Sequence, residues 1–122
     1  MTDDELKSKL AAAREFEYRA GERVSIRLAI PSQDAIRRIY ARHPSDVRLN
    51  EGMADTLTAS LRGIRGATLA DLGLAGEDAL PDSALSAREY VAEHPALADE
   101  LAYELFRRAR ERFDRIEQDR KN

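Results

Sequence analysis

The sequence contains no cysteine and no tryptophan, and only two of its 122 residues are histidine. The absence of cysteine excludes disulfide bonds, thiolate metal sites and a cysteine nucleophile. Aromatic residues make up 6% of the chain, whereas Asp, Glu, Lys and Arg together make up 35%. This composition is typical of a helical protein with solvated faces and unlike that of a β-sandwich.

Long hydrophobic runs are also missing. No apolar stretch reaches the length that a bilayer-spanning helix needs. The N-terminus, MTDDELKSKL, is acidic and lacks the apolar core of a signal peptide. The sequence therefore predicts a soluble, cytosolic protein without membrane contacts. Its length is close to the commonest domain size, so we expect residues 1–122 to form one domain.

Charge of one sign does not dominate either, because the net charge is only −3. A slightly negative chain is a poor candidate for a dedicated nucleic-acid binder. Basic residues outnumber acids over residues 31–66, and acids outnumber bases over residues 67–95. This asymmetry would suit a homo-oligomer or a charged partner, although an ordinary solvated surface is its commoner meaning.

Hydrophobic periodicity predicts a helix and then a strand at the start of the chain. Thr2 or Asp3 is suited to cap the helix. Residues 24–30 alternate between apolar and polar, as in a half-buried strand. Residues 11–20 fit two interpretations: the alternating stretch EFEYR would form a hairpin with a turn at Gly21, and the same residues would also extend the helix.

Two further helices are predicted in the middle of the chain. Ser32 is a good N-cap for the first, and His43–Pro44 ends it because the residue before proline avoids the helical conformation. The second begins within residues 45–50 and ends at the glycines of the GIRG segment, Gly63 and Gly66. Its expected apolar stripe consists of Met53, Leu57 and Leu61, with Ile64 as a further member.

Two capping boxes indicate where later helices begin. Thr68–Asp71 has the spacing of a capping box and predicts a short helix. Ser86–Glu89 has the same spacing, and Leu85–Tyr90 has that of a hydrophobic staple. The helix that follows should end at His94–Pro95.

A long final helix completes a mainly α fold of about five helices with a small N-terminal β-strand or β-hairpin (α+β). Charges of both signs separate the apolar residues of that helix, which are Leu97, Leu101, Leu105, Phe106, Ala109, Phe113 and Ile116. The expected core consists of Leu28, Ile30, Ile36, Ile39, Leu57, Leu61, Leu69, Leu101, Leu105 and Phe113.

The GIRG segment has two interpretations. A G-x-x-G loop between two helices can clamp RNA phosphates, and the alternative nucleic-acid clamp would consist of Arg62, Gly63, Arg65 and Gly66. Stacking aromatic residues are absent nearby, and the chain beyond is acidic and helical. A glycine turn that ends one helix and starts the next is far more common, so we favour the turn.

Catalytic groups have little support in the sequence. His43 and His94 each precede a proline at a predicted helix end, and neither has the neighbours of a triad or a metal cluster. The adjacent carboxylate pairs are not opposed across a cleft, and no Walker or Rossmann loop is present. We therefore expect no enzyme activity, no metal and no cofactor.

The chain resembles the tail assembly chaperones of long-tailed (siphovirus-type) bacteriophages. The resemblance lies in LTASLRGIRGATLADL, a short loop, and ALPDSALSAREYVAEHPALADELAYELFRRARER, in that order. The opening FEYRAGERVSIRLAIPSQDAIRRI is similar to that family's strand or hairpin followed by a proline and a helix. Together these segments cover most of the chain, and they mark no catalytic or partner-binding positions.

The resemblance implies a non-enzymatic assembly factor in the host cytoplasm. Such chaperones bind the helical tape-measure protein, shield its apolar surface, recruit tail-tube protein and are not retained in the mature virion. A long helix with an uncovered apolar stripe would aggregate, and an amphipathic groove can cover it. The alternatives are a small RNA- or DNA-binding regulator that uses the GIRG turn and a structural adaptor between phage head and tail.

The last three residues, Arg120, Lys121 and Asn122, are compatible with a slippery heptamer in the coding sequence. Members of the family often make a longer product by minus-one ribosomal frameshifting near the end of the short form. The hypothesis is that this chain is the short form of a frameshifted pair, and the alternative is that Lys-Asn stands at this position by accident. An arginine codon that ends in C, G or T would remove this candidate site.

Overall fold

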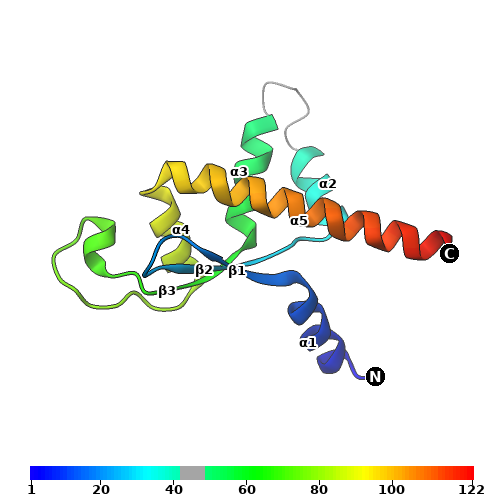
Figure 1. Ribbon diagram of the computed structural model, residues 1–122, viewed down its shortest axis with the longest axis horizontal. Coiled ribbons are helices and arrows are strands. Elements are labelled where there is room, and N and C mark those ends of the chain that lie inside the picture. Colours follow the sequence, from blue (N-terminus) through cyan, green and yellow to red (C-terminus); the bar gives the residue numbers. More distant parts are fainter. Residues whose placement is uncertain (42–48) are drawn as a thin grey trace. The chain divides into compact units, whose positions relative to one another are not determined.

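A computed structural model describes residues 1–41 and 49–122, which form five α-helices, one 3₁₀ helix and three strands (Figure 1). The predicted class, mainly α with an N-terminal β element, is confirmed. The chain folds into two compact units. Residues 1–29 and 61–94 make unit 1, and residues 30–60 and 95–122 make unit 2, so the chain passes between the units three times.

Unit 1 begins with helix α1, Asp3–Arg14, followed directly by strand β1, Glu15–Arg19. The hydroxyl of Thr2 caps the helix by accepting the Glu5 N–H at 3.1 Å. The ambiguous residues 11–20 thus divide between both expected structures, with the change at Glu15. The helix cannot continue through this stretch because its alternating residues pair with the next strand.

Strand β2, Ser25–Ala29, pairs antiparallel with β1, and Arg27 lies opposite Glu17. Gly21, with a φ of 146°, lies in the turn between them, as predicted for a hairpin. One face of β2 is fully buried through Ile26 and Leu28. The period-two pattern therefore identified both the strand and its inward face.

A third strand, β3, occupies residues that were predicted to be helical. Helix α3, Leu49–Ser60, ends before the glycines, and β3 spans Leu61–Arg65 at the edge of a sheet with the order β1-β2-β3. The prediction that Gly63 and Gly66 end a helix is therefore wrong. Leu61 and Ile64 are buried as expected, but antiparallel pairing with β2 buries them. That pairing joins residues about 35 positions apart, beyond the reach of local periodicity.

The short helix η2, Leu69–Leu72, begins at the predicted Thr68–Asp71 capping box, which is confirmed. Helix α4, Ala84–Ala92, contacts β3, and its residues Ala87, Tyr90 and Val91 are buried.

The start predicted for helix α4 is wrong. Its N-cap is Ser83, whose hydroxyl accepts the Ser86 N–H at 3.2 Å, so Ser86–Glu89 is not the capping box. Leu85 is 60% exposed and forms no staple. Ser83 has the same cap chemistry as Ser86, and it lies three residues closer to the loop.

Unit 2 consists of α2, Gln33–Ala41, together with α3 and the 27-residue α5, Pro95–Lys121. Ser32 caps α2 as predicted, because its Oγ accepts the Ala35 N–H at 3.1 Å. Helix α3 packs against both α2 and α5. The predicted end of the first middle helix, His43–Pro44, lies outside the described residues.

The predicted core is largely confirmed. Its buried members are Leu28, Ile30, Ile39, Leu57, Leu61, Leu101 and Leu105. Ile36, Leu69 and Phe113 are half-buried.

Candidate partner-binding surface

The paired glycines of unit 1 lie beside a carboxylate. Gly63 is opposite Arg27 in the sheet, and a Cβ on Gly63 would lie only 2.0 Å from Asp82 Oδ1. That oxygen accepts the backbone N–H of Ile64 at 3.0 Å. The first glycine thus leaves room for an acidic side chain to cover part of the open edge of β3.

Asp82 also binds two arginines. Its Oδ2 is 3.1 Å from Arg27 Nη1 and 3.3 Å from Arg65 Nε. The hydrogen bond from Arg27, with further contributions from Arg65 and the Ile64 N–H, lowers the pKa of the Asp82 carboxyl below its ordinary value. The positive charge of Arg65, which an RNA phosphate would need, is therefore already paired with a carboxylate of the same chain.

The other residues of the alternative clamp also have internal contacts. Arg65 lies 3.8 Å from Glu17, and Arg62 donates to the carbonyl of Leu61 at 3.2 Å. The carbonyl of Gly66 accepts from Arg23 at 2.7 Å. All four residues belong to, or directly follow, an edge strand, whereas the RNA clamp requires a loop between two helices.

Of the two histidines, His94 lies within the described residues, and its ring contacts helix α4. His94 Nδ1 lies 2.6 Å from the carbonyl oxygen of Tyr90, and the two rings stack with centroids 4.1 Å apart. This contact closes the C-terminal end of α4. His43 is outside the described residues, and residues 1–41 and 49–122 contain no cluster of His, Asp or Glu suited to a metal ion.

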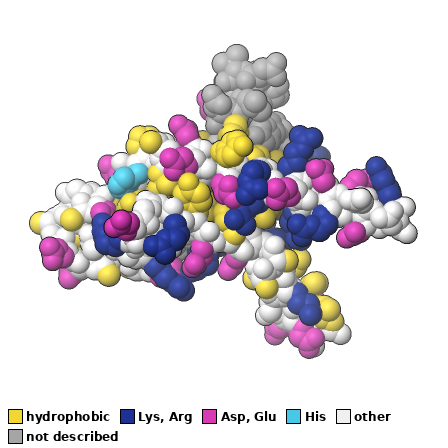
Figure 2. Space-filling model, viewed as in Figure 1, with side chains coloured by type: hydrophobic (Ala, Val, Ile, Leu, Met, Phe, Trp, Pro, Cys, Tyr) yellow, Lys and Arg dark blue, Asp and Glu magenta, His cyan; other side chains and the backbone are white. Residues whose placement is uncertain are grey.

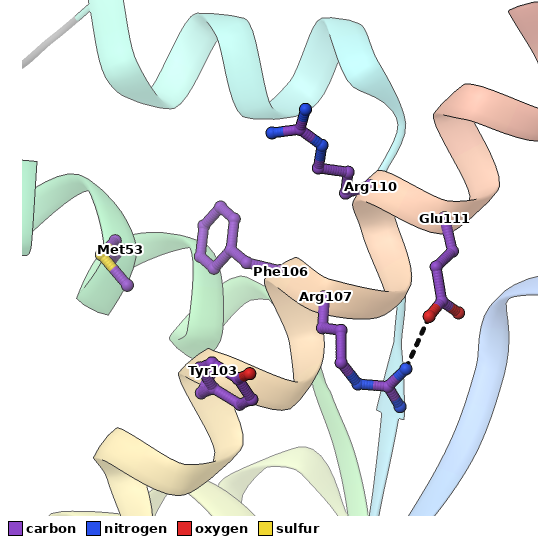
Figure 3. Close-up of a pocket in the computed structure, with 6 residues that line it drawn as sticks. All are labelled: Met53, Tyr103, Phe106, Arg107, Arg110 and Glu111. Carbon is purple, nitrogen blue, oxygen red and sulfur yellow. Dashed lines mark hydrogen bonds and ion pairs between the residues drawn. The ribbon is translucent and has the colours of Figure 1, made fainter.

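Unit 2 carries an open apolar hollow between α3 and α5. Its volume is about 470 Å³, and it is lined by Met53, Tyr103, Phe106, Arg107, Arg110 and Glu111. Figure 3 shows the ring of Phe106 directed from α5 toward the side on which Met53 of α3 lies. Tyr103 is 71% exposed at one end of the hollow. An aromatic side chain this exposed adds nothing to the core that its neighbours Leu101 and Leu105 form.

A second hollow continues along the same helix. It measures about 420 Å³ and is lined by Ile36, Phe106, Ala109, Arg110, Phe113 and Asp114. The two share Phe106 and Arg110, so we treat them as one surface, the α5 groove, that extends along α5 from Tyr103 to Phe113. Ten residues of helix correspond to about 15 Å, which is the length of three turns of a second helix.

Charged side chains surround the α5 groove. Glu104 accepts hydrogen bonds from Arg107 and Arg108, which lower the pKa of its carboxyl. Arg107 also binds Glu111 at 2.6 Å, the contact dashed in Figure 3. Side chains of both signs are interspersed along α5 on the face drawn in Figure 2. The rim is therefore internally paired around an apolar floor.

Arg110 is the exception on this rim. Its side chain is 85% exposed, and its contact with Asp114 is long, at 3.9 Å. A guanidinium held this loosely is available to a carboxylate from another molecule.

The composition of the α5 groove is that of a protein–protein contact surface. Met, Tyr, Phe and Arg are the residue types enriched at interfaces and at their energetic hot spots. The sequence contains only a weak signal for this surface, which is that Tyr103 and Phe106 flank the Leu101–Leu105 stripe on one side of α5. Met53 is 50 residues away in the chain, so only the packing of α3 on α5 brings it to them.

No protein-family model, curated protein or solved structure matches this chain. Among the residues that the structure describes, no helix has the length and apolar content to cross a membrane.

Proposed function

We propose that this chain is a phage tail assembly chaperone that transiently binds the tape-measure protein and helps recruit tail-tube subunits, without catalysing a reaction. The sequence resemblance supplies the identity of the partners. The observation that supports the proposal from the structure is the α5 groove, an open apolar surface on a chain that is otherwise rich in charge.

The occupant of the groove is an amphipathic helix of the tape-measure protein. Helices bind such grooves through apolar side chains at positions i, i+3 or i+4, and i+7. The two hollows lie along Tyr103, Phe106 and Phe113, which are three and seven residues apart, so they can receive apolar side chains at those intervals. An acidic residue on the flank of the bound helix would pair with Arg110, the one rim cation described above as loosely held.

Reversibility follows from the same features. A groove of about three turns buries a limited area, and interfaces of this size are transient. The internally paired rim adds little affinity, because its charges already have partners. Such a surface can cover a growing tape-measure helix and then release it when tail-tube subunits pack around it.

The proposal is tested by co-expressing the chain with a helical fragment of the tape-measure protein from the same phage. We expect the fragment to be soluble with the wild-type chain and insoluble alone. Tyr103→Asp places a charge at the mouth of the groove and should return the fragment to the pellet. Because Tyr103 is 71% exposed, the variant should keep the wild-type circular dichroism spectrum.

Leu85→Asp is the matched control. Leu85 is 60% exposed on α4 and is not among the residues that line the α5 groove, so this variant also replaces a large exposed apolar side chain with a carboxylate. We expect it to solubilise the fragment as the wild type does. A fragment that is equally insoluble with and without the wild-type chain would refute the proposal. If the two variants had equal effects on the fragment's solubility, the α5 groove would not be the surface that binds it.

A structural head–tail adaptor would differ in one measurable property. An adaptor remains in the finished particle, whereas a transient chaperone leaves it. We therefore expect mass spectrometry to find this chain in infected cells and not in purified virions.

A further inference from the structure

Toward its C-terminal end, the apolar stripe of α5 leaves the core of unit 2: Ala109 is 2% exposed, Phe113 is half-buried and Ile116 lies beyond them. Every residue from 114 to 122 is exposed, and Ile116 is 46% exposed. Ala109, Phe113, Ile116 and Arg120 follow one another at intervals of four, three and four residues. This is the spacing by which one helix packs along another in a coiled coil.

Charges of opposite sign flank this stripe on both sides. Arg110 and Glu117 lie on one flank, seven residues apart, and Arg112 and Asp119 lie on the other at the same separation. Seven residues are two helical turns, so each pair stays on its own flank. Arg112 is half-buried and Asp119 is exposed, and neither has an ion pair within the described part of the chain.

We propose that the C-terminal half of α5 pairs antiparallel with the same segment of a second copy. The two-fold axis passes between residues 114 and 115. Phe113 then packs on Ile116 of the second copy, and Ile116 packs on its Phe113. The symmetry repeats each contact, which is the rule for a two-fold interface.

The charges select this alignment over the others. It places Arg112 against Asp119 of the second copy, which gives two new ion pairs by symmetry. It also places Arg110 against Glu117 of the second copy, where each would exchange its contact on its own helix, with Asp114 and Arg120, for one across the interface. Moving one helix by one heptad would instead place Arg110 against Arg110 and Arg112 against Arg112. A parallel pair would match only Arg112 with Glu117. Like charges at these flanking positions are the usual means by which helices reject a wrong register.

The contact is small, since its apolar centre consists of Phe113 and Ile116 from each copy. Interfaces below about 1,000 Å² are weak, so the dimer should form only at high protein concentration. The pairing shares Arg110 and Phe113 with the α5 groove, so a second copy and a tape-measure helix would compete for that end of the groove. Self-association is nevertheless measured on this chain alone, so its failure is distinguishable from failure of the proposed function.

Sedimentation equilibrium from about 10 μM to 1 mM tests the proposal over the range in which weak dimers dissociate. The wild-type weight-average mass should rise from the 13.7 kDa monomer toward twice that value. Arg112→Asp should stay monomeric throughout. The double variant Arg112→Asp with Asp119→Arg should dimerise again, because the exchange restores both ion pairs.

Arg115→Asp is the control, with the same change of charge on a residue outside the stripe and its flanks. Arg112 is half-buried and Arg115 is exposed, so both variants should first show the wild-type circular dichroism spectrum. Arg115→Asp should dimerise as the wild type does. A wild-type chain that is monomeric over the whole range would overturn the proposal. So would equal behaviour of Arg112→Asp and Arg115→Asp, or a double variant that stays monomeric. If the variants change binding of the tape-measure fragment and leave self-association untouched, the stripe belongs to that partner.

Discussion

The carbonyl oxygen of Arg23 lies 1.9 Å from the position that a Cβ on Gly66 would occupy. Gly66 also has a φ of +87°, so two constraints meet at the end of β3. Its own carbonyl accepts a hydrogen bond from the Arg23 side chain. The second glycine of GIRG is therefore required by a close approach of two backbone segments, a different reason from the Asp82 contact that requires the first.

Gly66→Ala should strongly destabilise unit 1. The left-handed backbone alone costs an alanine about 1–2 kcal/mol, and the clash with a backbone oxygen, which cannot rotate away, adds to it. Gly73→Ala is the control: its φ is +75°, but a Cβ there meets nothing within 4 Å. Urea unfolding should show about 1–2 kcal/mol lost for Gly73→Ala and at least about 3 kcal/mol lost for Gly66→Ala. Similar losses would show that backbone crowding at Gly66 is unimportant.

Gly63→Ala should displace the Asp82 carboxylate from the edge of β3. The added methyl would lie 2.0 Å from Asp82 Oδ1, so the hydrogen bond to the Ile64 N–H must break. We expect a loss of about 1–3 kcal/mol. Because the carboxylate is already displaced, adding Asp82→Ala to Gly63→Ala should cost little more. Full additivity of the two changes would mean that the contact does not exist.

The alternative function, a nucleic-acid-binding regulator, can be tested at the GIRG segment. If GIRG held phosphates, changing Arg62 and Arg65 to alanine would weaken binding of single-stranded RNA at low salt. We expect no difference from the control double variant Arg88→Ala with Arg115→Ala, which removes the same charge elsewhere. A selective loss in the GIRG variant would favour the regulator.

Asp71 should contribute stability that depends on pH. Hydrogen bonds from the Arg23 side chain and the Thr68 N–H lower the pKa of its carboxyl. A carboxyl whose pKa is lower when folded stabilises the protein fully above its unfolded pKa of about 3.9, and this stabilisation is lost as the pH falls through the folded value. Asp71→Asn should therefore cost about 1 kcal/mol at pH 7. The thermal stabilities of wild type and variant should converge near pH 2, and a difference that persists there would exclude ionisation as its cause.

Leu105→Ala should destabilise unit 2 by about 2–5 kcal/mol, because Leu105 is only 1% exposed and the cavity cannot fill with water. Phe106→Ala, one residue further along α5 on the groove, should cost less. Hydrogen exchange can assign each loss to α3 and α5 amides. Equal losses would mean that Phe106 belongs to the core and is not available to a partner.

Local patterns identified the elements whose determinants lie close together in the chain. The alternating residues of β2, the Ser32 cap and the Thr68–Asp71 box are examples, because a strand face, a helix cap and a capping box each depend on a few neighbouring residues. The start of α4 was misassigned from equally local evidence. Ser83 and Ser86 are chemically identical caps, and the chain's path out of the preceding loop decides between them.

The position of β3 and the α5 groove required long-range packing. Leu61 and Ile64 suit a helix stripe as well as they suit a strand, and pairing with β2 makes them a strand. Met53 and Phe106 are 53 residues apart, and no periodicity connects them.

The sequence by itself determined that this is a mainly helical chain without cysteine chemistry, with its helix caps and inward faces marked by residue type and spacing. Those properties follow from local backbone geometry and from the solvation of single side chains. Only the tertiary structure decided that GIRG is an edge strand covered by Asp82 and that an apolar groove lies on α5. Both depend on which distant segments meet, because a carboxylate beside Gly63 and a hollow beside Phe106 exist only once other parts of the chain have folded against them.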